Sequence, residues 1–480
     1  MIEYISTKGG IAPVGFDQAV LAGFADDGGL FVPDSIPRIS RGKLAELSHL
    51  SYTDLAFALA SLFIDPALIP STDLNALIKK SFKPFEHPEL MPLVPMKQDK
   101  NLVIMELFHG PTLSFKDIAM GFLINVMDYL LAQKNEHLNI VLATTGDTGP
   151  AAAFASAGKS TIDCWPLYPA DMISPEQERQ MTTLHQDNIH PFSVTHCKDG
   201  GDDLDVVVAG LFSKPGIQKS LNLSSVNSIN WCRVMVQAIH YFFGYFRACD
   251  TLGDPVVFSV PSGAFGNLFA GYLARRMGLP VTGFVCANNV NNALSTALTT
   301  GVFEKRPLRR TVSSAIDIVV PYNFWRFLYF LGGSDPEKIN DWMTRFQTDG
   351  RVRVAEEMNL AVQQGFSAVT VSDADTLATI RQAFTADRPY LLDPHGAVAV
   401  AAAREAASRY PAHTRMVCLA TAHPAKFPDI ITRALDTPDL PDPAVHPFLE
   451  QMRTRRRHVW ICDREDLAPA LIRAMEKHTP

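Results

Sequence analysis

Residues 139–160 read NIVLATTGDTGPAAAFASAGKS, and this stretch contains the pattern that decides the fold. Its apolar start, NIVLATT, predicts a strand, TTGDTG predicts a turn, and the alanine-rich residues 149–158 predict a helix. The apolar run is continuous rather than alternating, which is typical of a strand buried on both faces in a parallel sheet.

The same succession recurs between residues 101 and 422. Further strands are predicted at 101–107, 161–169, 190–197, 256–261, 281–287 and 416–422, and a second helix at 266–277. Alternating strands and helices indicate an α/β fold with mostly parallel sheets, and the length favours two sheets over one. Ligands of such sheets bind beyond the carboxyl ends of the strands, so we look for chemistry in the turns that follow them.

Both ends of the chain depart from this pattern. Residues 15–25 predict a short helix, which the sequence DDGG at 26–29 is expected to end before the extended segment LFVP. The proline-rich stretch at 82–95 indicates a linker, and the last residues contain PDLPDP and a charge-rich helical end. We therefore divide the chain into residues 1–95, 96–430 and 431–480.

The composition excludes several classes of protein. The 480 residues are 47% hydrophobic and 19% charged, which excludes global disorder, and the net charge of −7 argues against a nucleic-acid partner. No apolar run is long enough for a membrane span, and the start lacks the apolar core of a secretory signal, so we expect a cytoplasmic protein. The seven scattered cysteines favour free thiols, and the dispersed histidines favour no metal site.

The turn HGPTLSFKD at 109–117 carries a candidate nucleophile, Lys116. Its aromatic and small hydroxyl neighbours, just after a buried strand, predict partial desolvation of the amine. Desolvation lowers the pKa of a lysine and makes it nucleophilic, as a Schiff base requires. Taken alone, this segment more often describes a surface lysine at the start of a helix.

Two small-residue turns are candidates for anion binding. The TTGDTG turn combines hydroxyl groups with the free N–H groups of a helix start, although an ordinary strand-to-helix connection has the same form. VPSGAFGNLFAG at 260–271 opens a helix in the same way, and such a nest of N–H groups can hold a phosphate. GKS at 158–160 is not part of a P-loop, because Ala153 occupies the position that requires glycine.

Two polar segments complete the set of candidates. Thr421, in LATAHPAKFPD at 419–429, ends a predicted strand, and its hydroxyl can donate and accept a hydrogen bond. In NSINWCR at 227–233, Arg233 offers a bidentate contact to phosphate. Each segment also fits a structural role, as a capping threonine or as a capped helix with a surface arginine.

Together and in this order, HGPTLSFKD, TTGDTG, NSINW-x-R, VPSGAFGN and TAHPAKF resemble threonine synthase, a pyridoxal-phosphate enzyme of the tryptophan-synthase-β-like fold. The opening segment FDQAVLAGFADDGGLFVP also looks like that family. The resemblance implies two mostly parallel α/β domains that form a cleft within residues 96–430. They would follow a helical or mixed N-terminal segment of the family's type and precede a C-terminal helical tail.

The resemblance also implies a role for each motif. Lys116 is similar to the lysine that forms a Schiff base with pyridoxal 5'-phosphate, and Thr421 to the residue that faces the pyridine nitrogen. The cofactor phosphate would be bound by Gly263, Ala264, Phe265, Gly266 and Asn267. The substrate would be bound by Thr144, Thr145, Gly146, Asp147 and Thr148 at its carboxylate, with Thr148 near its phosphate, and by Asn227, Ser228 and Arg233 at its phosphate.

The implied reaction converts O-phospho-L-homoserine and water to L-threonine and phosphate, in a monomer or a homodimer. Two departures from the family pattern concern the substrate: Ala264 replaces the asparagine of S-G-N-F-G, and in DPHGAVAV at 393–400 Gly396 and Ala399 replace a threonine and a glycine. They leave open a related phospho-lyase that gives 2-oxobutyrate or uses another nucleophile. A non-catalytic binding protein on the same fold is an alternative of a different class.

Overall fold

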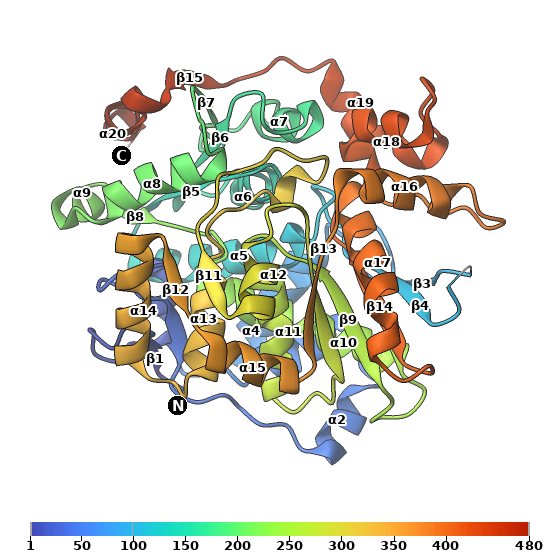
Figure 1. The fold of residues 1–480 in the computed structure, drawn as a ribbon. Coiled ribbons are helices and arrows are strands. Elements are labelled where there is room, and N and C mark those ends of the chain that lie inside the picture. The colour runs from blue at the N-terminus through green and yellow to red at the C-terminus, as the bar shows by residue number, and fades with distance from the viewer. Residues whose placement is uncertain (1, 98, 479–480) are drawn as a thin grey trace.

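The computed structural model describes residues 2–97 and 99–478, and Figure 1 shows how they are arranged. Residue 1, residue 98 and residues 479–480, which belong to the three expected units, lie outside this description. The α/β fold and its two main sheets are as expected from the sequence, with two additional two-stranded sheets.

The larger sheet has six strands in the order β13–β10–β9–β14–β4–β3, and neighbouring strands run parallel except for the antiparallel pair β3 and β4. Its strands are β3 (Leu93–Pro95), β4 (Leu102–Glu106), β9 (Val256–Pro261), β10 (Gly283–Asn288), β13 (Phe366–Thr370) and β14 (Arg415–Ala420). All residues of β9 and β10 are buried, which explains their continuous apolar sequences.

The smaller sheet has five strands in the order β15–β7–β6–β5–β8, all parallel to their neighbours. Its strands are β5 (Leu138–Ala143), β6 (Ile162–Pro169), β7 (Phe192–Thr195), β8 (Leu223–Ser224) and β15 (Trp460–Asp463). The C-terminal tail therefore adds a strand to this sheet besides its helices, and Figure 1 shows β15 beside β7 at the top of the molecule.

The N-terminal segment is mixed, as expected. It consists of β1 (Tyr4–Ser6), α1 (Phe16–Ala22), β2 (Phe31–Pro33), α2 (Arg41–Leu47), α3 (Tyr52–Ala60) and α4 (Ser71–Phe82). The helix α1 ends before the DDGG sequence that was predicted to end it, because Gly23 already takes a left-handed φ of 75°.

Helices follow most strands of the two main sheets. Those connected with the smaller sheet are α6 (Thr148–Ser156), α7 (Pro175–Thr182), α8 (Gly201–Phe212), α9 (Pro215–Ser220) and α20 (Leu467–His478). The others are α5 (Lys116–Lys134), α10 (Trp231–Ala248), α11 (Gly266–Arg276), α12 (Ala293–Thr300), α13 (Asn323–Leu331), α14 (Pro336–Asp349), α15 (Ala355–Gln363), α16 (Asp373–Phe384), α17 (Pro394–Ala406), α18 (Pro428–Leu435) and α19 (Pro447–Arg453), with the strand pair β11 (Val302–Glu304) and β12 (Arg351–Arg353). None of the helices in the described ranges has the length and hydropathy needed to cross a membrane.

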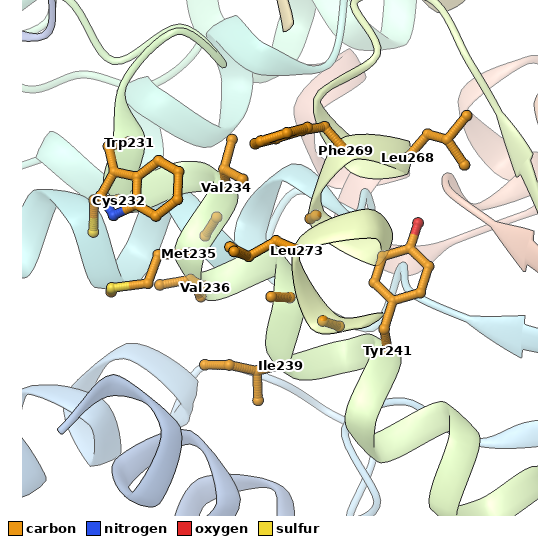
Figure 2. Close-up of a cluster of buried hydrophobic side chains, with 14 of the residues drawn as sticks. Trp231, Cys232, Val234, Met235, Val236, Ile239, Tyr241, Leu268, Phe269 and Leu273 are labelled. Carbon is orange, nitrogen blue, oxygen red and sulfur yellow. The ribbon is translucent and has the colours of Figure 1, made fainter. Parts of the chain in front are cut away.

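The helix α10 lies at the centre of the core. Every residue of this helix except Arg247 is buried, so the helix packs against neighbours on every side. Figure 2 shows its side chains, among them Trp231, Val234 and Ile239, together with Leu268 and Phe269 of α11. This packing holds the first turn of α10, which carries Arg233, in a defined position.

The contact of α11 with its neighbours requires a glycine. A Cβ atom on Gly271 would lie 2.6 Å from Cε1 of Phe284 and 2.7 Å from Cε1 of Tyr241. By contrast, a Cβ on Gly210 of α8 would meet no heavy atom of the described residues within 4 Å. The two helical glycines therefore differ in their surroundings rather than in their secondary structure.

We expect Gly271→Ala to lower the midpoint of thermal unfolding relative to the matched variant Gly210→Ala. Both substitutions gain about 1 kcal/mol of helix propensity, but only the first forces buried aromatic rings to move, which costs about 1–3 kcal/mol. Differential scanning calorimetry of the two variants measures this difference. Equal midpoints would contradict the close packing of α10 and α11.

Candidate active site

A cavity of about 860 Å³ lies beyond the carboxyl ends of strands from both main sheets. The turns after β4, β5, β9 and β14 all contribute to its wall. Parallel strands direct their carboxyl ends to one edge of a sheet, so residues distant in sequence meet there.

Lys116 projects into this cavity from the first turn of α5. Its loop is held by the end of β14, because the Phe115 N–H donates a hydrogen bond to the Thr421 carbonyl at 2.8 Å. The lysine is accessible only in part, and burial together with the positive charge of Arg233 lowers its pKa to about 7. At neutral pH a large fraction of this amine is therefore unprotonated, which is the nucleophilic form.

The turn from Ser262 to Asn267 forms a tight backbone cradle at the start of α11. A Cβ on Gly263 would lie 2.9 Å from the Ile316 Cα, and Phe265 adopts a left-handed φ of 63°. The first N–H groups of a helix have no partner within the helix, so those of α11 are free to bind an anion in the cavity. The cradle accordingly suits a phosphate without a charged side chain.

Arg233 supplies a second anion site in the same cavity. Only 1% of the residue is exposed, and its Nη1 donates to the Val226 carbonyl at 2.8 Å. Its Nε and Nη2 atoms are buried without a hydrogen-bond partner among the described residues. A buried guanidinium with unused donors is costly unless a ligand accepts from it, so these atoms indicate an anionic ligand.

The wall contains a further donor without a hydrogen-bond partner in the described part of the chain, the side-chain Nδ2 of Asn267. The Oδ1 of this residue accepts a hydrogen bond from the Tyr241 hydroxyl at 2.9 Å, which leaves the amide nitrogen available to a ligand. A reactive amine, a backbone cradle and unpaired donors in one cavity fit the aldehyde and the phosphate of pyridoxal 5'-phosphate.

The structure brings together nearly all residues that the sequence singled out. The cavity is lined by Lys116, Thr144, Thr145, Asp147, Thr148, Asn227, Ser228, Arg233, Gly263, Ala264, Phe265, Gly266, Asn267 and Thr421. Gly146 is not among the lining residues; its φ is 133°, and its Cα faces the side chain of Gln177. The individual roles of these residues stay predictions.

Sequence reasoning assigned no role to three polar residues of this region. His395 lines the cavity and lies 2.8 Å from Asp393, and Gln237 lines it with an Oε1 that has no hydrogen-bond partner among residues 2–97 and 99–478. Lys426 is fully buried and lies 2.6 Å from Asp147. A charged residue in the turn that follows a buried strand, as in TAHPAKF, was the available signal for Lys426.

Known proteins with similar sequences support a pyridoxal-phosphate site. The sequence matches "Threonine synthase N terminus" over residues 3–82, "Pyridoxal-phosphate dependent enzyme" over residues 89–422 and "Threonine synthase, C-terminal" over residues 396–471. It is 38% identical over 461 residues to threonine synthase-like 2 of Xenopus laevis, which covers 95% of each chain. It is also 38% identical over 448 residues to threonine synthase of Saccharomyces cerevisiae, covering 88% of this chain and 87% of the yeast protein.

A solved structure shares the whole fold. The crystal structure of pyridoxal-phosphate-bound threonine synthase from Brucella melitensis has a TM-score of 0.90 and 37% identity, and the match covers 100% of this chain and 99% of that chain. The fold and the site thus define a pyridoxal-phosphate-dependent enzyme. Within this class, the chain belongs to the threonine synthase family. The resemblance found in the five motifs is confirmed, together with the fold and the cofactor that it implied.

The low pKa of Lys116 has a consequence for cofactor binding. When pyridoxal phosphate is added to the cofactor-free protein, we expect the rate of imine formation to rise with pH around a midpoint of about 7. Only the unprotonated amine attacks the aldehyde, and an ordinary lysine would give a midpoint near about 10.4. Stopped-flow absorbance measures this rate, and Lys116→Arg is the control that should give no imine. A midpoint above about pH 9 would contradict the desolvation of Lys116.

Proposed function

We propose that the protein converts O-phospho-L-homoserine and water to L-threonine and phosphate. The observation that carries this proposal is the position of the Lys116 amine in a cavity with two sets of anion-binding groups, the Gly263–Asn267 cradle and the Arg233 guanidinium. A cofactor phosphate needs one such site, and a substrate that carries its own phosphate needs the other. Membership of the threonine synthase family supports the same reaction.

The residues that would hold the cofactor come from three turns. The cradle of residues 263–267 would hold its phosphate, Thr421 would lie toward its ring nitrogen, and the Lys116 amine would be the group that bonds to its aldehyde carbon. Bound pyridoxal phosphate supplies an electron sink that acidifies the Cα–H bond of an attached amino acid. The hydroxyl of Thr421 is neutral, so it accepts or donates a hydrogen bond without adding a charge at the ring.

The chain itself supplies proton transfer and substrate binding. With a pKa of about 7, Lys116 can take a proton from Cα and return one later in the reaction. The start of α6 and the TTGDTG hydroxyls bind the substrate carboxylate, while Asn227, Ser228 and Arg233 bind its phosphate. Because the protein carries a net charge of −7, these local donors must provide the attraction for an anionic substrate.

Two sequence features favour a second candidate reaction in the same cavity. Ala264 lines the cavity where the family pattern has asparagine, and Gly396 stands where it has threonine. One relative at 38% identity is a threonine synthase-like 2. The alternative is a phospho-lyase that takes up water and releases 2-oxobutyrate, phosphate and ammonia, or that adds a nucleophile other than water.

Product analysis separates the two reactions. Incubation of the cofactor-loaded protein with O-phospho-L-homoserine should release phosphate and threonine in equal amounts, as measured by a phosphate assay and amino-acid chromatography. Phosphate release accompanied by 2-oxobutyrate instead of threonine would establish the alternative. The absence of any phosphate release would contradict both.

The role of Arg233 can be tested with a matched variant in the same helix. We expect Arg233→Met to raise KM for O-phospho-L-homoserine by about 10-fold to 100-fold, because a charge-assisted contact to phosphate is worth about 1.5–3 kcal/mol. The visible absorbance of the bound cofactor should stay. Arg247→Met, at the exposed end of α10, should leave KM unchanged. Loss of the visible absorbance in Arg233→Met would instead assign this arginine to the cofactor.

The remaining expectations from the sequence are also proposals. They are a cytoplasmic location, a monomer or homodimer without nucleic-acid or membrane partners, and boundaries near residues 95 and 430. The match to the N-terminal family ends at residue 82 and the match to the catalytic family begins at 89, which supports a boundary in the proline-rich stretch.

A further inference from the structure

Lys426 is a fully buried lysine to which the proposed reaction assigns no role. It ends the short 3₁₀ helix η3 (Pro424–Lys426) after strand β14, and its side chain is 0% exposed. Lysine is almost never fully buried unless it is paired, because removing an ammonium group from water is costly. The partners of Lys426 therefore indicate what this residue does.

The Lys426 ammonium connects turns from both main sheets. Its Nζ lies 2.6 Å from the Asp147 Oδ1, in the turn between β5 and α6. It also donates a hydrogen bond to the Thr112 carbonyl at 3.0 Å, in the loop that carries Lys116. One side chain thus fixes the position of Asp147 relative to the loop of the reactive lysine.

Asp147 is the member of this pair that lines the cavity with Lys116. Only 3% of it is exposed, and its Oδ1 also accepts a hydrogen bond from the Gln177 amide at 2.8 Å. Burial acts to raise the pKa of Asp147, but the charge of Lys426 and the proximity of His395 outweigh this effect and hold the pKa below its usual value. Asp147 is therefore a carboxylate, and its charge favours a positive charge on Lys116.

We propose that Lys426 is a positioning residue that keeps Asp147 as a fixed carboxylate in the wall of the cavity that Lys116 also lines, so that the imine formed by Lys116 retains its proton. This inference rests on the proposed role of Lys116. Without the ammonium group, Asp147 would be a buried carboxyl with fewer partners, and it would take up a proton. The imine would then lose its neighbouring negative charge.

Two positive charges act on Lys116 in addition to the carboxylate of Asp147. Arg233 and Lys426 act on Lys116, and both disfavour a positive charge there. Lys426 also acts on Asp117 and on His423. The direct effect of Lys426 on Lys116 is thus opposite in sign to its effect through Asp147, and the direction of a measured shift distinguishes the two.

The test is a pH titration of the visible absorbance of the cofactor-loaded protein, which distinguishes the protonated from the neutral imine. We expect Asp147→Asn and Lys426→Met each to lower the apparent pKa of the imine by about one unit or more. The double variant should show no larger shift than either single variant, because both act through one carboxylate. Lys426→Arg keeps the charge and should titrate like the unchanged protein.

Several outcomes would overturn the proposal. They are shifts of opposite sign in Lys426→Met and Asp147→Asn, no shift in either, additive shifts in the double variant, or a shift in Lys426→Arg. If Lys426→Met does not fold, the titrations of Lys426→Arg and Asp147→Asn still test the proposal. Absence of an imine band in the unchanged protein would contradict the role of Lys116 instead, so the two failures are distinguishable.

A second lysine–aspartate pair provides a structural control. Lys159 lies 2.8 Å from Asp128 and follows helix α6, whereas Asp147 precedes it. Lys159 and Asp128 are not among the residues that line the cavity. Lys159→Met should lower the thermal unfolding midpoint without moving the absorbance titration. An equal shift of the titration in this variant would show that the effect is a general loss of stability.

Discussion

The backbone pairing between residues 107–115 and residues 420–423 is the constraint on which the active site depends. The Leu107 N–H donates to the Ala420 carbonyl at 3.0 Å, Phe115 to Thr421 at 2.8 Å, and His423 to Leu113 at 3.0 Å. These bonds extend the contact of β4 with β14 beyond the ends of the strands. They place Lys116 and Thr421, which are remote in sequence, on the same wall of the cavity.

Several charged side chains are buried at this wall or next to it. Lys116 and Arg233 bring two potential positive charges to the cavity, and Asp147, which lines it with them, is paired with the buried Lys426. Burial strengthens electrostatic interactions between such groups because little water screens them. An anionic ligand that bound here would add a negative charge close to Lys116, and its binding would be coupled to the protonation of this lysine.

Much of the fold could be predicted from the sequence, because continuous apolar runs mark most of the buried strands. The strands with long apolar runs, such as IVLA in β5 and VVFSVP in β9, were found near their observed bounds. Strand β13 was missed, because FSAVT interrupts its apolar residues with serine and threonine. The strand β15 was missed because its residues are largely exposed, so no apolar pattern marks it.

The sequence by itself determined which chemical groups follow which strands: a lysine after β4, hydroxyls and an aspartate after β5, a glycine turn after β9 and a threonine after β14. Local composition dictates such strand–turn–helix units, and their order along the chain resembles a family. Only the tertiary structure decided the surroundings of these groups. The unused donors of Arg233 and the contact of Lys426 with Thr112, 314 residues away, arise only when distant turns and helices come together around the cavity. Burial and pairing of a charge depend on all of its neighbours in space, and a sequence pattern specifies only those that lie nearby in the chain.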